Sequence, residues 1–155
     1  MKLDIGLPEK SRAAVARVLN AVLSDEVVLY IKTRNFHWNV TGMQFNDLHK
    51  FFEAQYEALD DIVDEVAERA RALGARSFGT LAEFIQHTRL KERPGKAPAA
   101  RAMIAALLAD HEAIIRTLRA DLEACAGTHG DMGTSDFLTG LMERHEKMAW
   151  MLRSF

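Results

Sequence analysis

Residues 32–74 read KTRNFHWNVTGMQFNDLHKFFEAQYEALDDIVDEVAERARALG. Along the second part of this stretch an apolar side chain recurs every three or four positions, as on one face of an amphipathic helix. These side chains are Leu48, Phe52, Tyr56, Leu59, Val63, Val66, Ala70 and Leu73. Asn39 to Gly42 has turn composition, and Gly74 is a typical helix-stop residue. The stretch therefore predicts the end of one helix, a turn and a second long helix.

The rest of the chain shows the same helical period, with two further breaks at Arg89–Pro98 and Gly127–Gly133. No strand-like alternation of apolar and polar residues extends beyond a few positions. The expected helices are Pro8–Trp38, Gln44–Leu73, a short one at Leu81–Thr88, Ala99–Ala126 and Ser135–Arg153. Four long helices with a long excursion between the second and third predict an all-α, ferritin-like four-helix bundle. The short helix lies in that crossover.

Composition limits the classes of protein to which the chain can belong. Its 155 residues suit one domain over 1–155, and a net charge of −2 gives no general affinity for nucleic acid or anionic lipid. A single cysteine, Cys125, excludes an intrachain disulfide framework. The first residues lack the apolar stretch of a signal peptide, and no run of apolar residues is long enough for a membrane span. We expect a cytoplasmic protein, and association with the nucleoid stays open.

Five residues stand out as candidate metal ligands: His37, His49, Glu53, Asp64 and Glu68, at successive intervals of 12, 4, 11 and 4 residues. With His49 taken as zero on the second helix, the three acidic residues lie at about 40°, 60° and 100° around the axis. All four helix residues therefore share one arc. Within each i, i+4 pair the side chains are one turn apart and can reach a common ion.

The rise of the helix separates the two pairs. Glu53 and Asp64 are about 16 Å apart along the axis, so one straight helix cannot close both pairs around one metal. Either the pairs serve separate purposes, or a second copy of the helix runs antiparallel across a two-fold axis near Ala58 and Leu59. In that arrangement, Asp64 and Glu68 of one subunit would face His49 and Glu53 of the other.

Carboxylates combined with imidazoles suit Fe(II) or Mn(II), and less readily zinc. The competing interpretation is that the acidic residues form an ordinary solvated helix face. The sequence has no Glu-x-x-His pairs of the kind that in-bundle di-iron proteins use. It also offers few ionisable residues to the bundle interior. The histidines at 87, 111, 129 and 145 are expected to be surface or locally hydrogen-bonded residues. Any iron site is therefore expected outside the single bundle, at an interface.

The NFHWNVTG string within residues 32–74, together with the 12–4–11–4 spacing, closely resembles the signature of the Dps family (DNA-binding proteins from starved cells). The segment GDMGTSDFLTGLMERHEKMAWMLRS near the C-terminus extends the similarity. The resemblance implies a dodecameric homo-oligomeric cage with ferroxidase centres, di-iron or mono-iron, at its two-fold interfaces. His37, His49 and Glu53 would come from one subunit, and Asp64 and Glu68 from its mate. Many members have Asp where this chain has Glu53.

The same resemblance implies the chemistry: oxidation of Fe(II) by hydrogen peroxide, in preference to O₂, followed by mineral storage that protects the cell from oxidative damage. It also suggests auxiliary roles for four residues. Trp38 and Trp150 match aromatic positions near the centre, although both also suit a helix junction. Asp131 and Asp136 match positions that line an acidic three-fold pore, but the stronger explanation is local, since Asp131 is a turn residue and Asp136 an acid in the first turn of a helix.

The DNA-binding half of the family name has less support in this sequence. DNA-binding members commonly carry a mobile basic tail, whereas here only Lys2 and Asp4 supply charge before the first expected helix. Phosphate binding requires several cations that displace counterions. We expect weak or no DNA binding and keep a DNA-compacting nucleoid protein as the alternative function. A four-helix bundle with a solvated acidic stripe is a further alternative.

Overall fold

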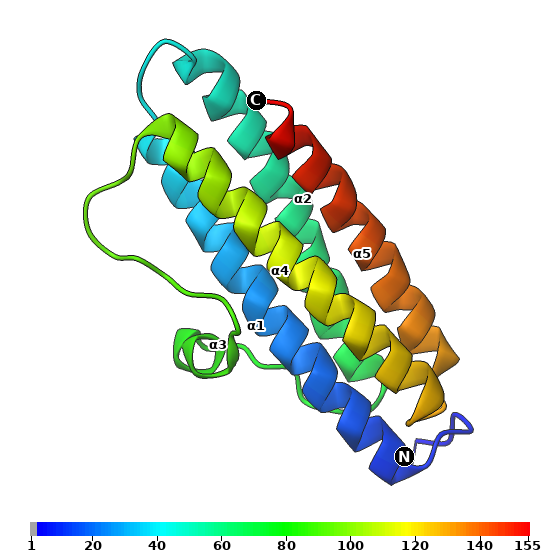
Figure 1. The fold of residues 1–155 in the computed structure, drawn as a ribbon. Helices are drawn as coiled ribbons and strands as arrows, with labels where there is room; N and C mark the ends of the chain where they lie inside the picture. The colour runs from blue at the N-terminus through cyan, green and yellow to red at the C-terminus, as the bar shows by residue number, and fades with distance from the viewer. Residues whose placement is uncertain (1–2) are drawn as a thin grey trace.

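The computed structural model describes residues 3–155 and places them in five helices, with no strand among these residues. The helices are α1 (Glu9–Asn39), α2 (Phe45–Ala72), α3 (Leu81–His87), α4 (Ala100–Gly127) and α5 (Met132–Arg153). The four long helices form a bundle, and α3 lies beside it in the crossover between α2 and α4 (Figure 1). The predicted all-α bundle with a short helix in its crossover is thus confirmed. Lys2, noted above for its charge, lies outside the described residues.

The core lies between two antiparallel pairs of helices. α1 packs mainly against α2, and α4 against α5. Each long helix contributes aliphatic or aromatic side chains at helical spacing, and these are almost completely buried. Examples are Leu19, Leu29, Phe52, Leu59, Leu107, Leu118, Leu138 and Leu152. Burial of these side chains is the main stabilising term of such a fold.

The expected helix ends agree with the structure to within about one residue, except at the start of α5. This helix begins at Met132, so the turn predicted for Gly127–Gly133 was too long. The reason is the cap: the Asp131 carboxylate accepts hydrogen bonds from Thr134 N at 2.9 Å and from Thr134 Oγ1 at 2.6 Å. Such a cap satisfies first-turn donors, and Gly133 is accommodated within that turn.

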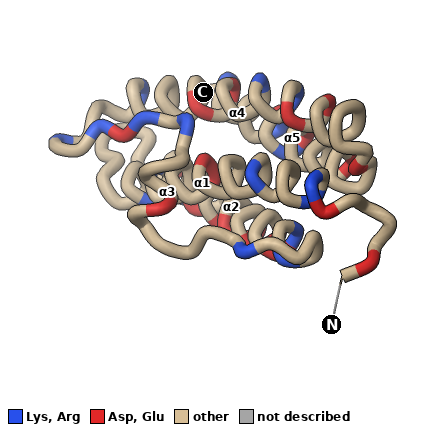
Figure 2. The backbone as a smooth tube through the Cα atoms, turned by 90° about the horizontal axis from the view of Figure 1, so that it is seen from below, with Lys and Arg blue, Asp and Glu red and all other residues tan. Residues whose placement is uncertain are grey.

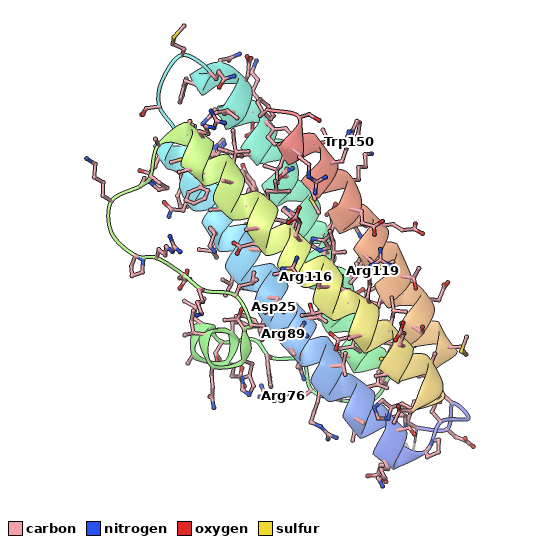
Figure 3. The ribbon with its side chains drawn as sticks, in the orientation of Figure 1. Asp25, Arg76, Arg89, Arg116, Arg119 and Trp150 are labelled. Atoms are coloured by element: carbon pink, nitrogen blue, oxygen red, sulfur yellow. The ribbon has the colours of Figure 1, made fainter. Side chains whose placement is uncertain are left out.

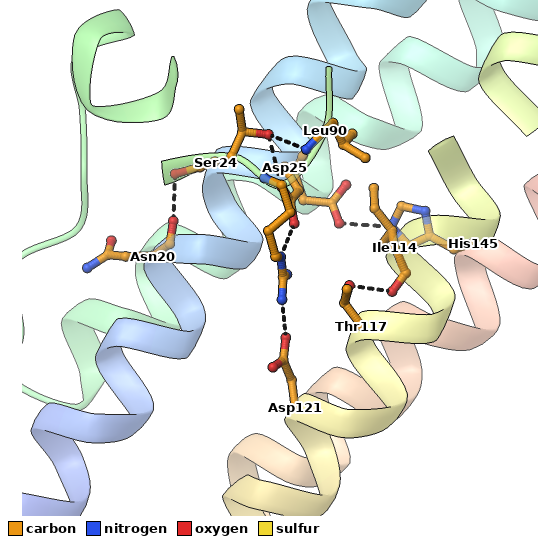
Figure 4. Close-up of polar contacts among 11 residues, drawn as sticks. Asn20, Ser24, Asp25, Leu90, Ile114, Thr117, Asp121 and His145 are labelled. Atoms are coloured by element: carbon orange, nitrogen blue, oxygen red, sulfur yellow. Dashed lines mark hydrogen bonds and ion pairs between the residues drawn. The ribbon is translucent and has the colours of Figure 1, made fainter. Parts of the chain in front are cut away.

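The crossover is fastened to α1 by a buried carboxylate. Asp25 accepts hydrogen bonds from Thr88 Oγ1 at 2.9 Å, from Arg89 N at 2.6 Å and from Arg89 Nε at 2.7 Å. Arg89 also pairs with Asp121 of α4 at 2.9 Å, so one arginine joins α1, the crossover and α4. Asp25 and Asp121, its two partners, are labelled in Figure 4. These contacts keep the long connection in a single conformation, because its polar backbone groups find partners on the bundle.

The bundle interior contains ionisable side chains that the sequence analysis did not expect there. Glu26 of α1, His111 of α4 and His145 of α5 are all fully buried. His145 Nε2 lies 2.9 Å from Glu26 Oε1, and His145 Nδ1 lies 2.9 Å from His111 Nδ1. The expectation of an interior with few ionisable residues was therefore wrong. Of the two roles expected for these histidines, a surface position is excluded, and both are hydrogen-bonded in the core. Their helical spacing matches the apolar face, which polar residues also occupy when they find partners.

None of the helices in the described part of the chain is long and apolar enough to cross a membrane.

Candidate metal centre

His37 and His49 lie against each other at one end of the bundle, where α1 ends and α2 begins. Their imidazole rings stack with centroids 3.8 Å apart and planes 19° apart. His37 Nδ1 lies 2.8 Å from the backbone carbonyl oxygen of His49, and His49 Nδ1 lies 2.9 Å from that of His37. The two histidines, twelve residues apart in sequence, thus lock the turn between the helices by a reciprocal pair of contacts.

These contacts fix the chemistry of both rings. A carbonyl oxygen only accepts, so each Nδ1 must carry the proton and donate it. In the neutral ring, Nε2 then keeps its lone pair and is the nitrogen available to a metal ion. A backbone carbonyl that orients a ring through its other nitrogen is the usual support of a metal-binding histidine. The two rings are therefore nearly parallel, and each has an Nε2 lone pair that can bind a metal ion.

Glu53 lies one turn beyond His49 on α2 and is partly exposed. Its Oε1 lies 3.5 Å from the hydroxyl of Tyr56. The carboxylate is thus on the same side of α2 as His49, as the i, i+4 spacing predicts. One subunit thus carries His37, His49 and Glu53 at the same end of the bundle, but the Glu53 carboxylate is not placed with the two imidazoles around a common metal position.

Asp64 and Glu68 do not join this group within one chain. Both are solvent-exposed, farther along the same straight helix. Asp64 belongs to a shallow acidic depression that is also lined by Asp60, Asp61 and Glu65. Among residues 3–155 of a single subunit, no three or more His, Cys, Asp or Glu side chains are placed to hold a metal ion together.

An aromatic cluster that was not predicted from the sequence lies behind the histidine pair, where the Tyr56 ring meets the His37 ring edge-on. The Arg34 guanidinium lies 4.9 Å from the ring centroid of Tyr56, 5.5 Å from that of Tyr30 and 5.3 Å from that of Trp38. It also donates a hydrogen bond to the Tyr30 hydroxyl, which contributes to raising the Arg34 pKa. The i, i+4 spacing of Tyr30, Arg34 and Trp38 along α1 was the available signal.

The two tryptophans named from the sequence are exposed in the single subunit. Trp38 has 63% of its surface accessible and Trp150 61%. Trp38 directly follows His37, and Trp150 lies near the C-terminal end of α5 (Figure 3). Phe155 contacts Phe51 with ring centroids 4.8 Å apart, which brings the end of α5 beside the start of α2. Both tryptophans are thus at the end of the bundle that carries the histidine pair.

The two aspartates suggested for a pore have different surroundings. Asp131 is buried, caps α5 and lies with its Oδ1 3.4 Å from Arg69 Nη2. Its carboxylate is therefore occupied by protein donors. Asp136 is exposed in the first turns of α5 and is free of such a capping role. Of the two, Asp136 has the surroundings expected for a residue that meets cations in solvent.

Comparison with known proteins decides the family. The ferritin-like domain matches this chain over residues 16–155. The DNA protection during starvation protein 2 of Bacillus anthracis is 37% identical over 141 residues, which cover 91% of this chain and 95% of that protein. The chain belongs to the Dps family of ferritin-like proteins. The resemblance noted in the NFHWNVTG stretch is thereby confirmed.

Solved Dps structures share the fold over the whole length. The crystal structure of a DPS protein from Vibrio cholerae O1 superposes with a TM-score of 0.91 at 32% identity and covers 99% of this chain and 96% of that one. It is described as a member of a broad superfamily of ferritin-like diiron-carboxylate proteins. An uncharacterized low temperature-induced protein of Nostoc is 46% identical over 154 residues, covering 99% of this Dps chain and 86% of that protein.

Proposed function

We propose that this Dps chain is the subunit of a ferroxidase and iron-storage cage that oxidises Fe(II) with hydrogen peroxide. The observation that carries the proposal is the reciprocal contact of His37 and His49, which leaves both Nε2 atoms free to bind metal. With Glu53 nearby, the donor set is imidazole and carboxylate, which suits Fe(II). Carboxylate also tolerates the ferric product. The named relatives support this function at the level of the family.

The remaining ligands would come from a second copy of the chain. Asp64 and Glu68 lie too far along α2 to reach His49 of their own subunit, at about 1.5 Å of rise per residue. A two-fold axis near Ala58 and Leu59 would place them opposite the histidine pair of a mate and create two equivalent centres. Iron bound there as one or two ions is the substrate. Twelve subunits around a cavity would hold the mineral.

The reaction balances with peroxide as the oxidant. Two Fe(II) each lose one electron, and one H₂O₂ takes both electrons, breaks its O–O bond and yields two hydroxides. Passing both electrons to one peroxide avoids the hydroxyl radical that a single-electron step would release. The protein's part is to hold the ions close together and to orient the ligands. We propose peroxide in preference to O₂ and protection from oxidative damage as the consequence.

Size and stoichiometry together test this proposal. Size-exclusion chromatography should give a large shell rather than a species near the subunit mass of 17.4 kDa. Anaerobic addition of peroxide to the Fe(II)-loaded shell should consume two Fe(II) for each H₂O₂, faster than O₂ does. A monomer without iron-dependent peroxide consumption would instead support the solvated-face interpretation.

DNA binding is the second candidate, and one observation favours it. Figure 2 shows basic positions along the crossover after α3, where Lys91, Arg93 and Lys96 are exposed. Against it, Glu92 lies among them, and Arg89 is engaged by Asp25 and Asp121. We expect weak or no binding at physiological salt. A gel shift that showed tight, salt-resistant complexes near neutral pH would contradict this expectation.

A further inference from the structure

Glu53, the one carboxylate among the three predicted ligands at this end of the bundle, has a polar neighbour that belongs to the apolar stripe of α2. The hydroxyl of Tyr56, three residues farther along α2, lies 3.5 Å from Glu53 Oε1. An ionised carboxylate only accepts, so the phenol is the donor.

The Tyr56 ring is held from two sides. The edge-on contact with the His37 ring has a centroid distance of 5.3 Å and an interplanar angle of 77°. The Arg34 guanidinium covers the ring at 4.9 Å and is itself tied to the Tyr30 hydroxyl. Cation–π and edge-to-face contacts of this kind restrict a ring without blocking its hydroxyl. The position of the phenol oxygen is therefore set by the helix that carries His37.

We propose that Tyr56 is a positioning residue that orients the Glu53 carboxylate toward the metal bound by His37 and His49. This inference rests on the proposed ferroxidase function. A glutamate has one more rotatable bond than an aspartate, so its carboxylate has more orientations to lose on binding a metal. A donor at Oε1 restricts those orientations and leaves Oε2 for the ion. The chain thus compensates for the longer ligand at position 53 with a fixed phenol.

The test removes only the hydroxyl. Tyr56→Phe keeps the ring and its contacts with Arg34 and His37. Tyr30→Phe is the control, because it removes the other tyrosine hydroxyl of the cluster, which meets Arg34 rather than Glu53, while Arg34 keeps its contacts with the Tyr56 and Trp38 rings. Anaerobic titration with Co(II), followed by its visible absorption, reports the affinity and the ligand geometry. We expect Tyr56→Phe to weaken Co(II) binding about three- to tenfold and to alter the absorption bands. Tyr30→Phe should stay within about twofold.

A double-mutant cycle identifies the carboxylate concerned. In a Glu53→Asp background the shorter side chain draws away from the hydroxyl, so Tyr56→Phe should add no further loss. Equal affinities and spectra for Tyr56→Phe and Tyr30→Phe, or full additivity with Glu53→Asp, would overturn the inference. A different result would contradict the proposed function. In that case the His37→Ala, His49→Ala double variant would bind Co(II) as tightly as the unsubstituted cage does.

Discussion

His37 and His49 each donate a ring N–H to the backbone carbonyl of the other, at 2.8 and 2.9 Å, while their rings stack at 3.8 Å. One contact pair thereby does two things. It closes the α1–α2 turn, and it fixes the tautomer in which both Nε2 atoms are free. A substitution at either histidine should consequently affect both metal binding and the local structure of the turn.

The first prediction concerns the split site. His37→Ala with His49→Ala, or Asp64→Ala with Glu68→Ala, should each slow Fe(II) oxidation by peroxide while the cage survives. When the two double variants are unfolded and reassembled together in equal amounts, half of the dimers are mixed. Each mixed dimer has one intact centre of two, so about a quarter of the normal activity should return. Stopped-flow oxidation of the mixture measures this.

The control is the same mixture without reassembly, which should stay inactive. No recovery after reassembly, with the shell mass restored, would contradict the split-site geometry. Unchanged kinetics in both double variants would refute the ligand assignment itself.

The second prediction concerns the anchor of the crossover. Asp25→Ala removes three hydrogen bonds from a buried carboxylate and leaves Arg89 with Asp121 alone. The free energy of unfolding should fall by about 2–4 kcal/mol. Asp121→Ala, which removes only the more exposed partner, should cost less than about 1 kcal/mol. Urea unfolding measures both, and equal losses would show that Asp25 is not the main anchor.

The third prediction is a pH dependence that arises in the core. Burial, and secondarily the neighbouring His145, lower the pKa of His111 well below its usual 6.5. A histidine with a depressed folded pKa binds more protons when the chain is unfolded. Its stabilising effect is therefore complete above pH 6.5 and is lost as pH falls below that value toward the folded pKa. The loss should approach about 1.4 kcal/mol per pH unit.

His111→Gln isolates this contribution, since glutamine is polar but does not titrate. The unfolding free energy of the variant should decline less steeply than that of the parent between pH 6.5 and 5. The comparison is of slopes, because the substitution also lowers stability at every pH. Identical slopes would show that His111 does not supply the acid sensitivity.

The fourth prediction separates the two aspartates of α5. Asp131→Ala should destabilise the subunit by about 1–2 kcal/mol, because it removes the cap on Thr134 and the partner of Arg69. Asp136→Ala should leave stability within about 0.5 kcal/mol. If Asp136 lines an entry pore, its replacement should slow Fe(II) uptake into the shell at low ionic strength. Uptake that matches the parent protein at every salt concentration would exclude that role.

Helical period alone was enough to predict the bundle, because each long helix has a continuous apolar face and the breaks have clear turn residues. The helical period predicted the start of α5 wrongly, because the Asp131 cap starts the helix several residues before its apolar pattern begins. It also missed Glu26, His111 and His145, since polar residues on an apolar face are recognisable as core only when their partners on other helices are known. Tyr56 was assigned to packing for the same reason.

The helix order and the arc that His49, Glu53, Asp64 and Glu68 share could be predicted from the sequence, because both follow from local spacing. The family was indicated by resemblance of the NFHWNVTG stretch. Three relations appear only when the helices are packed together. His37 stacks on His49 with both Nδ1 atoms engaged, Arg34 and Tyr56 lie behind the pair, and Asp25 holds the crossover. These relations join residues of different segments. Their distances depend on how the helices pack, which no single helical repeat encodes.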